Sequence, residues 1–124
     1  MSTALVLFAH GARDPEWERP FRDIAARVAA RRSDLAVTLA FLEFQPPSLP
    51  EAIGECIGQG HRRIAIAPLF MAQGGHLKND MPRLLDELRR RYPDVTISLM
   101  PAIGDVEGLR AAMADWLVHH TPAL

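Results

Sequence analysis

Cysteine is nearly absent from this sequence, since Cys56 is the only one among 124 residues. A single cysteine excludes an intramolecular disulfide and any paired-thiolate zinc or redox motif. The apolar residues of segment 49–57 repeat at helical spacing around Cys56, which predicts a thiol on a buried helix face. A thiol in apolar surroundings is chemically inert, so we expect a structural role for it.

Long apolar runs and a surplus of one charge are also missing. No apolar run approaches the roughly 20 residues that cross a bilayer, and the first residues lack the basic region typical of a signal peptide. The 14 basic and 15 acidic residues give a net charge of −1, whereas proteins that bind phosphate backbones usually carry a strong basic excess. We therefore expect a cytoplasmic protein whose partners include neither a membrane nor a nucleic acid.

The length and the composition are those of one ordinary globular domain. Apolar residues make up 48% of the chain and charged residues 23%, which argues against disorder. A chain of this length buries roughly two-thirds of its unfolded surface, so it needs no disulfide for stability. We predict a single domain over residues 1–124, with an ordered core at about 4–118 and a frayed tail at 119–124.

Four short apolar segments alternate with four helical patterns. The expected strands are residues 4–9, 35–42, 64–67 and 95–99. The expected helices begin at the start signals Asp14-Pro15, Ser48-Leu49-Pro50-Glu51, Asn79-Asp80-Met81-Pro82 and Asp105 with Glu107. The fourth helix has an apolar face made of Val106, Leu109, Met113, Trp116 and Leu117.

Strand–helix alternation with short connections predicts a parallel sheet with right-handed crossovers. The expected fold class is therefore α/β: one doubly wound, four-stranded parallel sheet of (βα)4, flavodoxin-like type, in the order 2-1-3-4. Ligands of such sheets bind beyond the carboxyl ends of the strands, at the switch point between strands 1 and 3.

Two histidines and a glutamate lie just beyond the predicted strands at this switch point. His10 follows the first strand, Glu43 follows the second, and His76 lies in the loop after the third. Neighbouring strands are about 4.8 Å apart, so the three side chains can converge. Two imidazoles and a carboxylate with open positions suit a divalent first-row metal ion.

The residues alone leave other roles open. Each histidine could be a loop residue that forms a hydrogen bond, and Glu43 could cap a helix or pair with an arginine. Arg13 could form an ion pair with Asp14 or Glu16.

Three stretches of the chain resemble the class II tetrapyrrole chelatases, and most closely the small CbiX-type sirohydrochlorin chelatases. The stretches are residues 7–14 (LFAHGARD), residues 41–43 together with 47–50, and residues 68–76. The resemblance covers about residues 4–118. Ala12 departs from the family pattern, where serine is common, and Ala9 departs where glycine is common.

The resemblance implies a chelatase-like fold and the insertion of Co²⁺ or Fe²⁺, or Ni²⁺ in some archaeal members, into sirohydrochlorin for cobalamin or sirohaem synthesis. It implies that His10 and His76 hold the metal and that Glu43 is the acidic residue of the site. The metal is then a substrate, and no cofactor is permanently bound.

This activity also suggests residues that contact the macrocycle. Leu69, Phe70 and Met71 are expected to meet the flat ring, Arg13 and Lys78 its carboxylates, and the backbone around Gly74 and Gly75 to add N–H donors. A homodimer is expected, because longer family members join two such domains and because the predicted second strand is very apolar for a sheet edge.

Three other functions compete with the chelatase. A metal or tetrapyrrole carrier would use the same ligands without turnover. A histidine phosphatase would need an arginine before His10, where this chain has Ala9. A receiver or nucleotide-binding module would need an acidic pair or a Gly-rich phosphate loop after the first strand.

Overall fold

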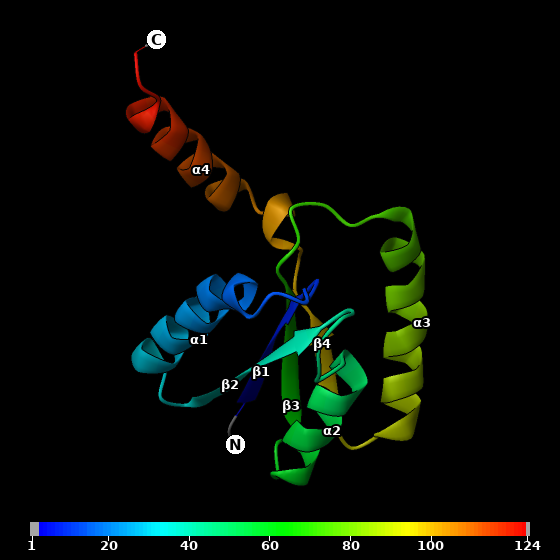
Figure 1. Ribbon diagram of the computed structural model, residues 1–124. Helices are drawn as coiled ribbons and strands as arrows, with labels where there is room; N and C mark the ends of the chain where they lie inside the picture. Colours follow the sequence, from blue (N-terminus) through cyan, green and yellow to red (C-terminus); the bar gives the residue numbers. More distant parts are fainter. Residues whose placement is uncertain (1–2, 124) are drawn as a thin grey trace.

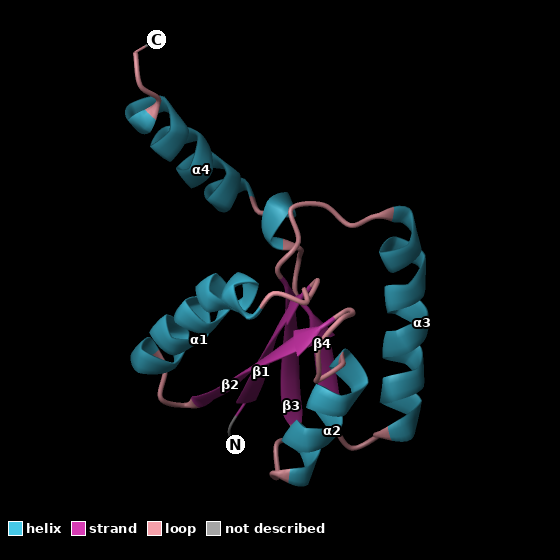
Figure 2. Cartoon of the chain, in the orientation of Figure 1, coloured by secondary structure: helices cyan, strands magenta, loops and turns pink. Residues whose placement is uncertain are grey.

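The computed structural model describes residues 3–123, apart from the side chain of His76. Strands and α-helices alternate along the described chain (Figures 1 and 2). The strands are β1 (Thr3–Ala9), β2 (Leu35–Phe41), β3 (Arg63–Pro68) and β4 (Thr96–Leu99). The helices are α1 (Arg19–Arg31), α2 (Leu49–Gly58), α3 (Gly75–Arg91) and α4 (Glu107–His120), with short 3-10 helices η1 (Pro15–Glu18) and η2 (Ile103–Asp105).

The four strands form one parallel sheet in the order β2-β1-β3-β4, as the sequence predicts. Leu7 in the middle of β1 pairs with Leu39 of β2 on one side and with Ala67 of β3 on the other. The predicted (βα)4 topology and its switch point between β1 and β3 are therefore confirmed.

The main hydrophobic core lies between the sheet and the helices α2 and α3, which share one face (Figure 1). The strand residues buried there are Ala4, Val6, Phe8, Ala40, Ile64, Ile66 and Ile97. The helix residues are Leu49, Ala52, Ile53 and Cys56 of α2, and Met81, Leu85 and Leu88 of α3. Cys56 is buried as predicted, and burial raises the pKa of its thiol.

On the other face of the sheet, α1 packs mainly against β2. The side chains of Phe21, Ala25 and Val28 are half-buried, Ile24 is exposed, and no residue of α1 is fully buried. The predicted start signal Asp14-Pro15 begins the 3-10 helix η1 and not α1. Asp14 caps η1 by accepting a hydrogen bond from the backbone N–H of Glu16 at 2.9 Å.

The third helix begins earlier than its predicted start at Asn79. It begins at Gly75, with Gly74 in the capping position, and Pro82 lies inside it. A proline within a helix removes one backbone hydrogen bond, here the one to the carbonyl of Lys78, and the surrounding turns of α3 remain helical. His76 and Lys78 therefore lie in a helix rather than in the expected loop.

The fourth helix departs furthest from expectation. It points away from the sheet (Figure 1), and none of its residues is buried. It also runs to His120, so the first two residues of the predicted tail are helical. Their imidazole Nδ1 atoms lie 2.7 Å from the Asp115 carbonyl for His119 and 2.8 Å from the Trp116 carbonyl for His120.

No helix within residues 3–123 combines the length and the apolar character needed to cross a membrane.

Candidate functional site

The ends of β1 and β2 are joined by backbone hydrogen bonds that bring His10 and Glu43 together. The Leu42 N–H donates to the Ala9 carbonyl at 2.9 Å, and the Glu43 N–H donates to the His10 carbonyl at 3.0 Å. The parallel ladder is thus extended beyond the strands by two residues. Both His10 and Glu43 are exposed at this carboxyl edge, as the topology predicts.

Gly11 makes this close approach of the two loops possible. Its φ of +91° lies in the left-handed region that favours glycine. A Cβ atom added at Gly11 would lie 1.9 Å from the carbonyl oxygen of Glu43, which leaves no space for a side chain.

The imidazole of His10 packs against an aromatic ring beneath it. The ring centroids of His10 and Phe70 are 4.4 Å apart, and Phe70 in turn contacts Phe8 edge-on at 5.4 Å. Only 1% of Phe70 is exposed, so the expectation that it meets the macrocycle directly is wrong for this conformation. Phe70 instead supports His10 from the core.

His76 lies in the first turn of α3, and its side chain is outside the part that the structure describes. Among the described side chains, no three His, Cys, Asp or Glu residues form a group that could hold a metal ion. The predicted pairing of His10 with His76 therefore remains a prediction.

An apolar cleft of about 310 Å³ adjoins these residues, between the carboxyl edge of the sheet and α3. Its lining residues are Phe8, Leu42, Leu77, Asp80, Met81 and Leu84. Phe8 lies two residues before His10, and Leu42 and Leu77 directly adjoin Glu43 and His76 in the chain. The cleft thus opens beside all three predicted site positions.

The other predicted contact residues surround the same edge. Among the described residues Arg13 forms no ion pair, and its guanidinium lies 4.9 Å from the centre of the Phe44 ring. Met71 and Lys78 are exposed, and Leu69 is half-buried. The alternative ion pair of Arg13 with Asp14 or Glu16 is absent among the described residues.

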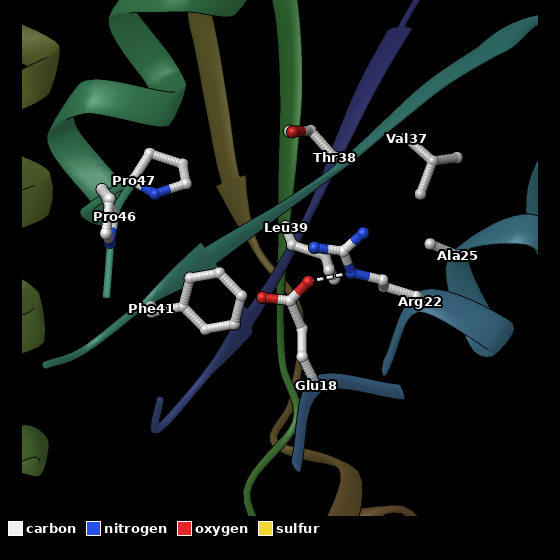
Figure 3. A pocket seen from close by; sticks show the side chains of 9 residues that line it. All are labelled: Glu18, Arg22, Ala25, Val37, Thr38, Leu39, Phe41, Pro46 and Pro47. Atoms are coloured by element: carbon white, nitrogen blue, oxygen red, sulfur yellow. Dashed lines mark hydrogen bonds and ion pairs between the residues drawn. The ribbon is translucent and has the colours of Figure 1, made fainter. Parts of the chain in front are cut away.

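A polar network that the sequence analysis missed holds the loop of His10 from the other side. The side-chain oxygen of Gln45 accepts a hydrogen bond from the Ala12 N–H at 2.9 Å, and its Nε2 donates to Glu18 at 2.5 Å. Glu18 also pairs with Arg22 (Figure 3). The Glu18 and Arg22 pair has helical i, i+4 spacing and was readable from the sequence; nothing in the sequence pattern pointed to Gln45.

A second cavity, of about 390 Å³, lies beside this network between α1 and β2 (Figure 3). It is lined by residues such as Glu18, Val37, Leu39 and Pro47, and it contains none of the predicted site residues. The apolar cleft beside His10 is therefore the cavity that fits the ligand position expected for a doubly wound sheet.

The fold and this edge define a doubly wound α/β protein with an exposed histidine and glutamate at the switch point of its sheet. Residues 4–119 match the family model CbiX, and the chain belongs to the CbiX family.

Two curated relatives carry the name sirohydrochlorin cobaltochelatase. The protein of Methanocaldococcus jannaschii is 39% identical over 82 residues, which cover 66% of this chain and 57% of that protein. The protein of Saccharolobus islandicus (strain L.S.2.15 / Lassen #1) is 33% identical over 120 residues, covering 92% of this chain and 89% of that protein. The match thus spans little more than half the length of the first relative.

Two solved structures share the fold. One is a putative cobalamin (vitamin B12) biosynthesis CbiX protein from Marinobacter aquaeolei VT8, with a TM-score of 0.79, 29% identity and coverage of 96% of this chain and 94% of that chain. The other is the sirohydrochlorin chelatase SirB from Bacillus subtilis subspecies spizizenii in complex with cobalt. Its TM-score is 0.78 at 27% identity, with coverage of 97% of this chain and 51% of that chain.

Proposed function

We propose that this protein is a sirohydrochlorin chelatase that inserts Co²⁺ or Fe²⁺ into the macrocycle, for cobalamin or sirohaem synthesis. The observation that carries the proposal is the exposed pair of His10 and Glu43 beside an apolar cleft at the switch point of the sheet. The names of the relatives, and the cobalt complex of one SirB structure, support the same activity.

In this proposal the divalent metal is a substrate held by His10 and His76, with Glu43 close by. Neutral imidazoles and a carboxylate bind first-row divalent ions without the tight hold of thiolates, so the metal can leave for the ring. His76 joins the site from the first turn of α3, on the opposite side of the cleft from Glu43.

The two pyrrole N–H groups of the macrocycle must lose their protons as the metal enters. Glu43 and a histidine of the site are the proposed proton acceptors. The protons leave as the ring nitrogens replace the protein ligands on the metal.

The apolar cleft gives the flat ring a surface, with Leu69 and Met71 at the loop after β3. The ring's peripheral carboxylates need cations, and the exposed Arg13 and Lys78 are the proposed partners. Backbone N–H groups at Gly74 and Gly75, where α3 begins, add donors for an anionic group.

The proposed working unit is a cytoplasmic homodimer. The match to SirB covers 51% of that chain, so the related protein is about twice as long as this one. A second copy of this chain would correspond to the part of SirB that the match does not cover.

The decisive experiment follows the absorbance of sirohydrochlorin under anaerobic conditions with the protein and Co²⁺ or Fe²⁺. We expect catalytic formation of the metallated ring and loss of most of this activity in His10→Ala. His119→Ala, which removes an exposed imidazole on α4, is the matched control and should retain the wild-type rate.

Two results would contradict the proposal. Stoichiometric binding of metal or macrocycle without turnover would instead indicate a carrier. A wild-type rate in His10→Ala would show that His10 is not part of the metal site. Glu43→Gln separates the two roles of the carboxylate, because a proton acceptor affects turnover more than metal binding, whereas a metal ligand affects both equally.

A further inference from the structure

The helix α4 carries an apolar stripe, and none of its residues is buried in its own chain. Leu109, Met113, Trp116 and Leu117 follow one another at helical spacing, and they are 40%, 46%, 61% and 56% exposed. The main contact of α4 within the chain is with the short helix η2. A stripe of large apolar side chains on a helix usually packs against a partner surface.

The direction of α4 is set by the way its first turn is anchored. The Gly104 N–H donates to the Phe70 carbonyl at 3.0 Å, and Arg110 donates to the Gly104 carbonyl at 3.0 Å and pairs with Glu107 at 2.8 Å. A Cβ on Gly104 would lie 1.6 Å from the Met71 carbonyl oxygen, so η2 sits directly on the loop after β3. With these contacts in place, α4 points outward (Figure 1).

The sheet has one half-face without a helix, over β3 and β4 on the side of α1. Ile64, Ile66 and Ile97 point to the opposite face, into the core with α2 and α3. The alternate residues Arg63, Ala65, Thr96 and Ser98 lie toward the bare side; Ala65 is half-buried and the other three are exposed. A shallow hollow of about 170 Å³ lies here. Parallel sheets are normally covered on both faces, so this half-face lacks a cover.

The free helix and the bare half-face match each other in size and in shape. The 14 residues of α4 span about 21 Å at roughly 1.5 Å per residue, and the six residues of β3 span about 20 Å. Beside the charged Arg63, the half-face presents the small side chains of Ala65, Thr96 and Ser98, against which the large side chains of α4 can pack. To cover its own sheet, α4 would have to give up the contacts of Arg110 and turn back.

We propose that two copies of this chain exchange their α4 helices, so that the stripe of one copy packs on the β3–β4 half-face of the other. The exchange is reciprocal and two-fold, which satisfies both copies at once. It rests on the homodimer proposed above and names its interface. Because η2 also holds the Phe70 carbonyl, the helix that crosses between the copies begins beside the support of His10.

Cross-linking between two variants, each with one added cysteine, tests the exchange. Ser98→Cys in one tagged chain and Met113→Cys in a second, co-expressed chain are treated with a short-armed bismaleimide. We expect a covalent product of one chain of each kind at 27.6 kDa, twice the 13.8 kDa chain. The native Cys56 is buried, its thiol pKa is raised by that burial, and the wild-type protein should not react.

The alternative packings give different products, and each would overturn the exchange. Cross-linking inside a Ser98→Cys/Met113→Cys double variant, at 13.8 kDa, would mean that α4 folds onto its own sheet. Efficient coupling of Met113→Cys chains to each other would mean helix-to-helix pairing. No product at all would mean that α4 has another partner. Ala111→Cys, on the opposite face of α4, is the control and should couple poorly to Ser98→Cys.

Light scattering coupled to size exclusion provides a second measurement that does not depend on cross-linking. Met113→Glu places a charge in the stripe and should shift the mass from 27.6 to 13.8 kDa, whereas Ala111→Glu should remain at 27.6 kDa. Far-ultraviolet circular dichroism checks that both variants are folded. A Met113→Glu protein that stays dimeric overturns the exchange. The metal-insertion assay on the wild type is independent, so failure of the proposed activity is seen separately.

Discussion

At the scale of single residues, Gly11 sets the distance between the two loops of the candidate site. Its positive φ and the nearby Glu43 carbonyl together exclude any side chain at this position. The backbone bond from the Glu43 N–H to the His10 carbonyl depends on this close approach. The close approach of the His10 and Glu43 backbones therefore depends on one missing Cβ atom.

We expect Gly11→Ala to lower the free energy of unfolding by about 1–3 kcal/mol, because the added methyl forces the two loops apart. Metal insertion should fall with it. Gly58→Ala is the matched control, since Gly58 lies in α2 with no atom within 4 Å of an added Cβ. Urea denaturation measures both variants, and equal midpoints for the two would contradict the steric explanation.

Gln45 acts on the same loop from its opposite side, through the Ala12 N–H and Glu18. Gln45→Ala should lower turnover several-fold, because the loop that carries His10 loses a fixed hydrogen bond of about 1 kcal/mol. Gln59→Ala removes an exposed glutamine at the end of α2 and should have no effect. A Gln45→Ala enzyme with wild-type kinetics would show that Phe70 and the strand ladder position His10 unaided.

At the scale of secondary-structure elements, α2 begins with the capping box that the sequence predicts. The Ser48 hydroxyl accepts a hydrogen bond from the Glu51 N–H at 3.2 Å, and the Glu51 carboxylate accepts one from the Ser48 N–H at 2.8 Å. Ser48→Ala should therefore cost about 1 kcal/mol of stability.

The pH dependence of this cap has a defined sign. The hydrogen bond from the Ser48 N–H lowers the pKa of Glu51 below its usual 4.5. A carboxyl with a lowered pKa stabilises the fold above its unfolded value, and the contribution is lost as the pH falls through the folded value. The stability difference between wild type and Glu51→Gln should be constant near neutrality and shrink below pH 4.5. Urea midpoints measured against pH test this, with Glu55→Gln as a control outside the cap.

The start of α3 shows how one residue type can mislead a prediction at this scale. Pro82 favours the first turn of a helix, and so Asn79 was the expected start. Gly74 and Gly75 are weak helix signals, yet they begin α3. The earlier start turns the expected loop around His76 into a helix.

At the scale of the whole molecule, the chain has a core on one face of its sheet and a thinner cover on the other. The packed face contains α2 and α3, whereas neither α1 nor α4 has a fully buried residue. In the proposed homodimer, a second copy would supply part of the missing burial.

The thermal unfolding midpoint should consequently depend on protein concentration. Because only folded chains form the dimer, dimerisation stabilises the folded state by mass action. A hundredfold increase in protein concentration corresponds to about 2.7 kcal/mol. We expect the midpoint to rise by several degrees between about 1 and 100 μM. Differential scanning fluorimetry or calorimetry measures it, and a midpoint independent of concentration would indicate a stable monomer.

The sequence by itself determined the local elements and their order. Alternating apolar segments and capping signals placed the strands and the start of α2, and the parallel order 2-1-3-4 followed from connectivity. That order also predicted that His10 and Glu43 lie side by side, because the carboxyl ends of adjacent parallel strands share one edge. These features depend on contacts between neighbours in the chain and on few possible topologies.

Only the tertiary structure decided which apolar surfaces have partners. The stripe of α4 and the stripe of α3 look alike in the sequence, yet α3 packs on the core and α4 is exposed. Phe70 and Met71 are adjacent apolar residues, yet one is buried beneath His10 and the other is exposed. Periodicity identifies an apolar face but does not indicate what that face packs against. The partner depends on long-range contacts, such as the hydrogen bond between Gly104 and Phe70, that direct the chain.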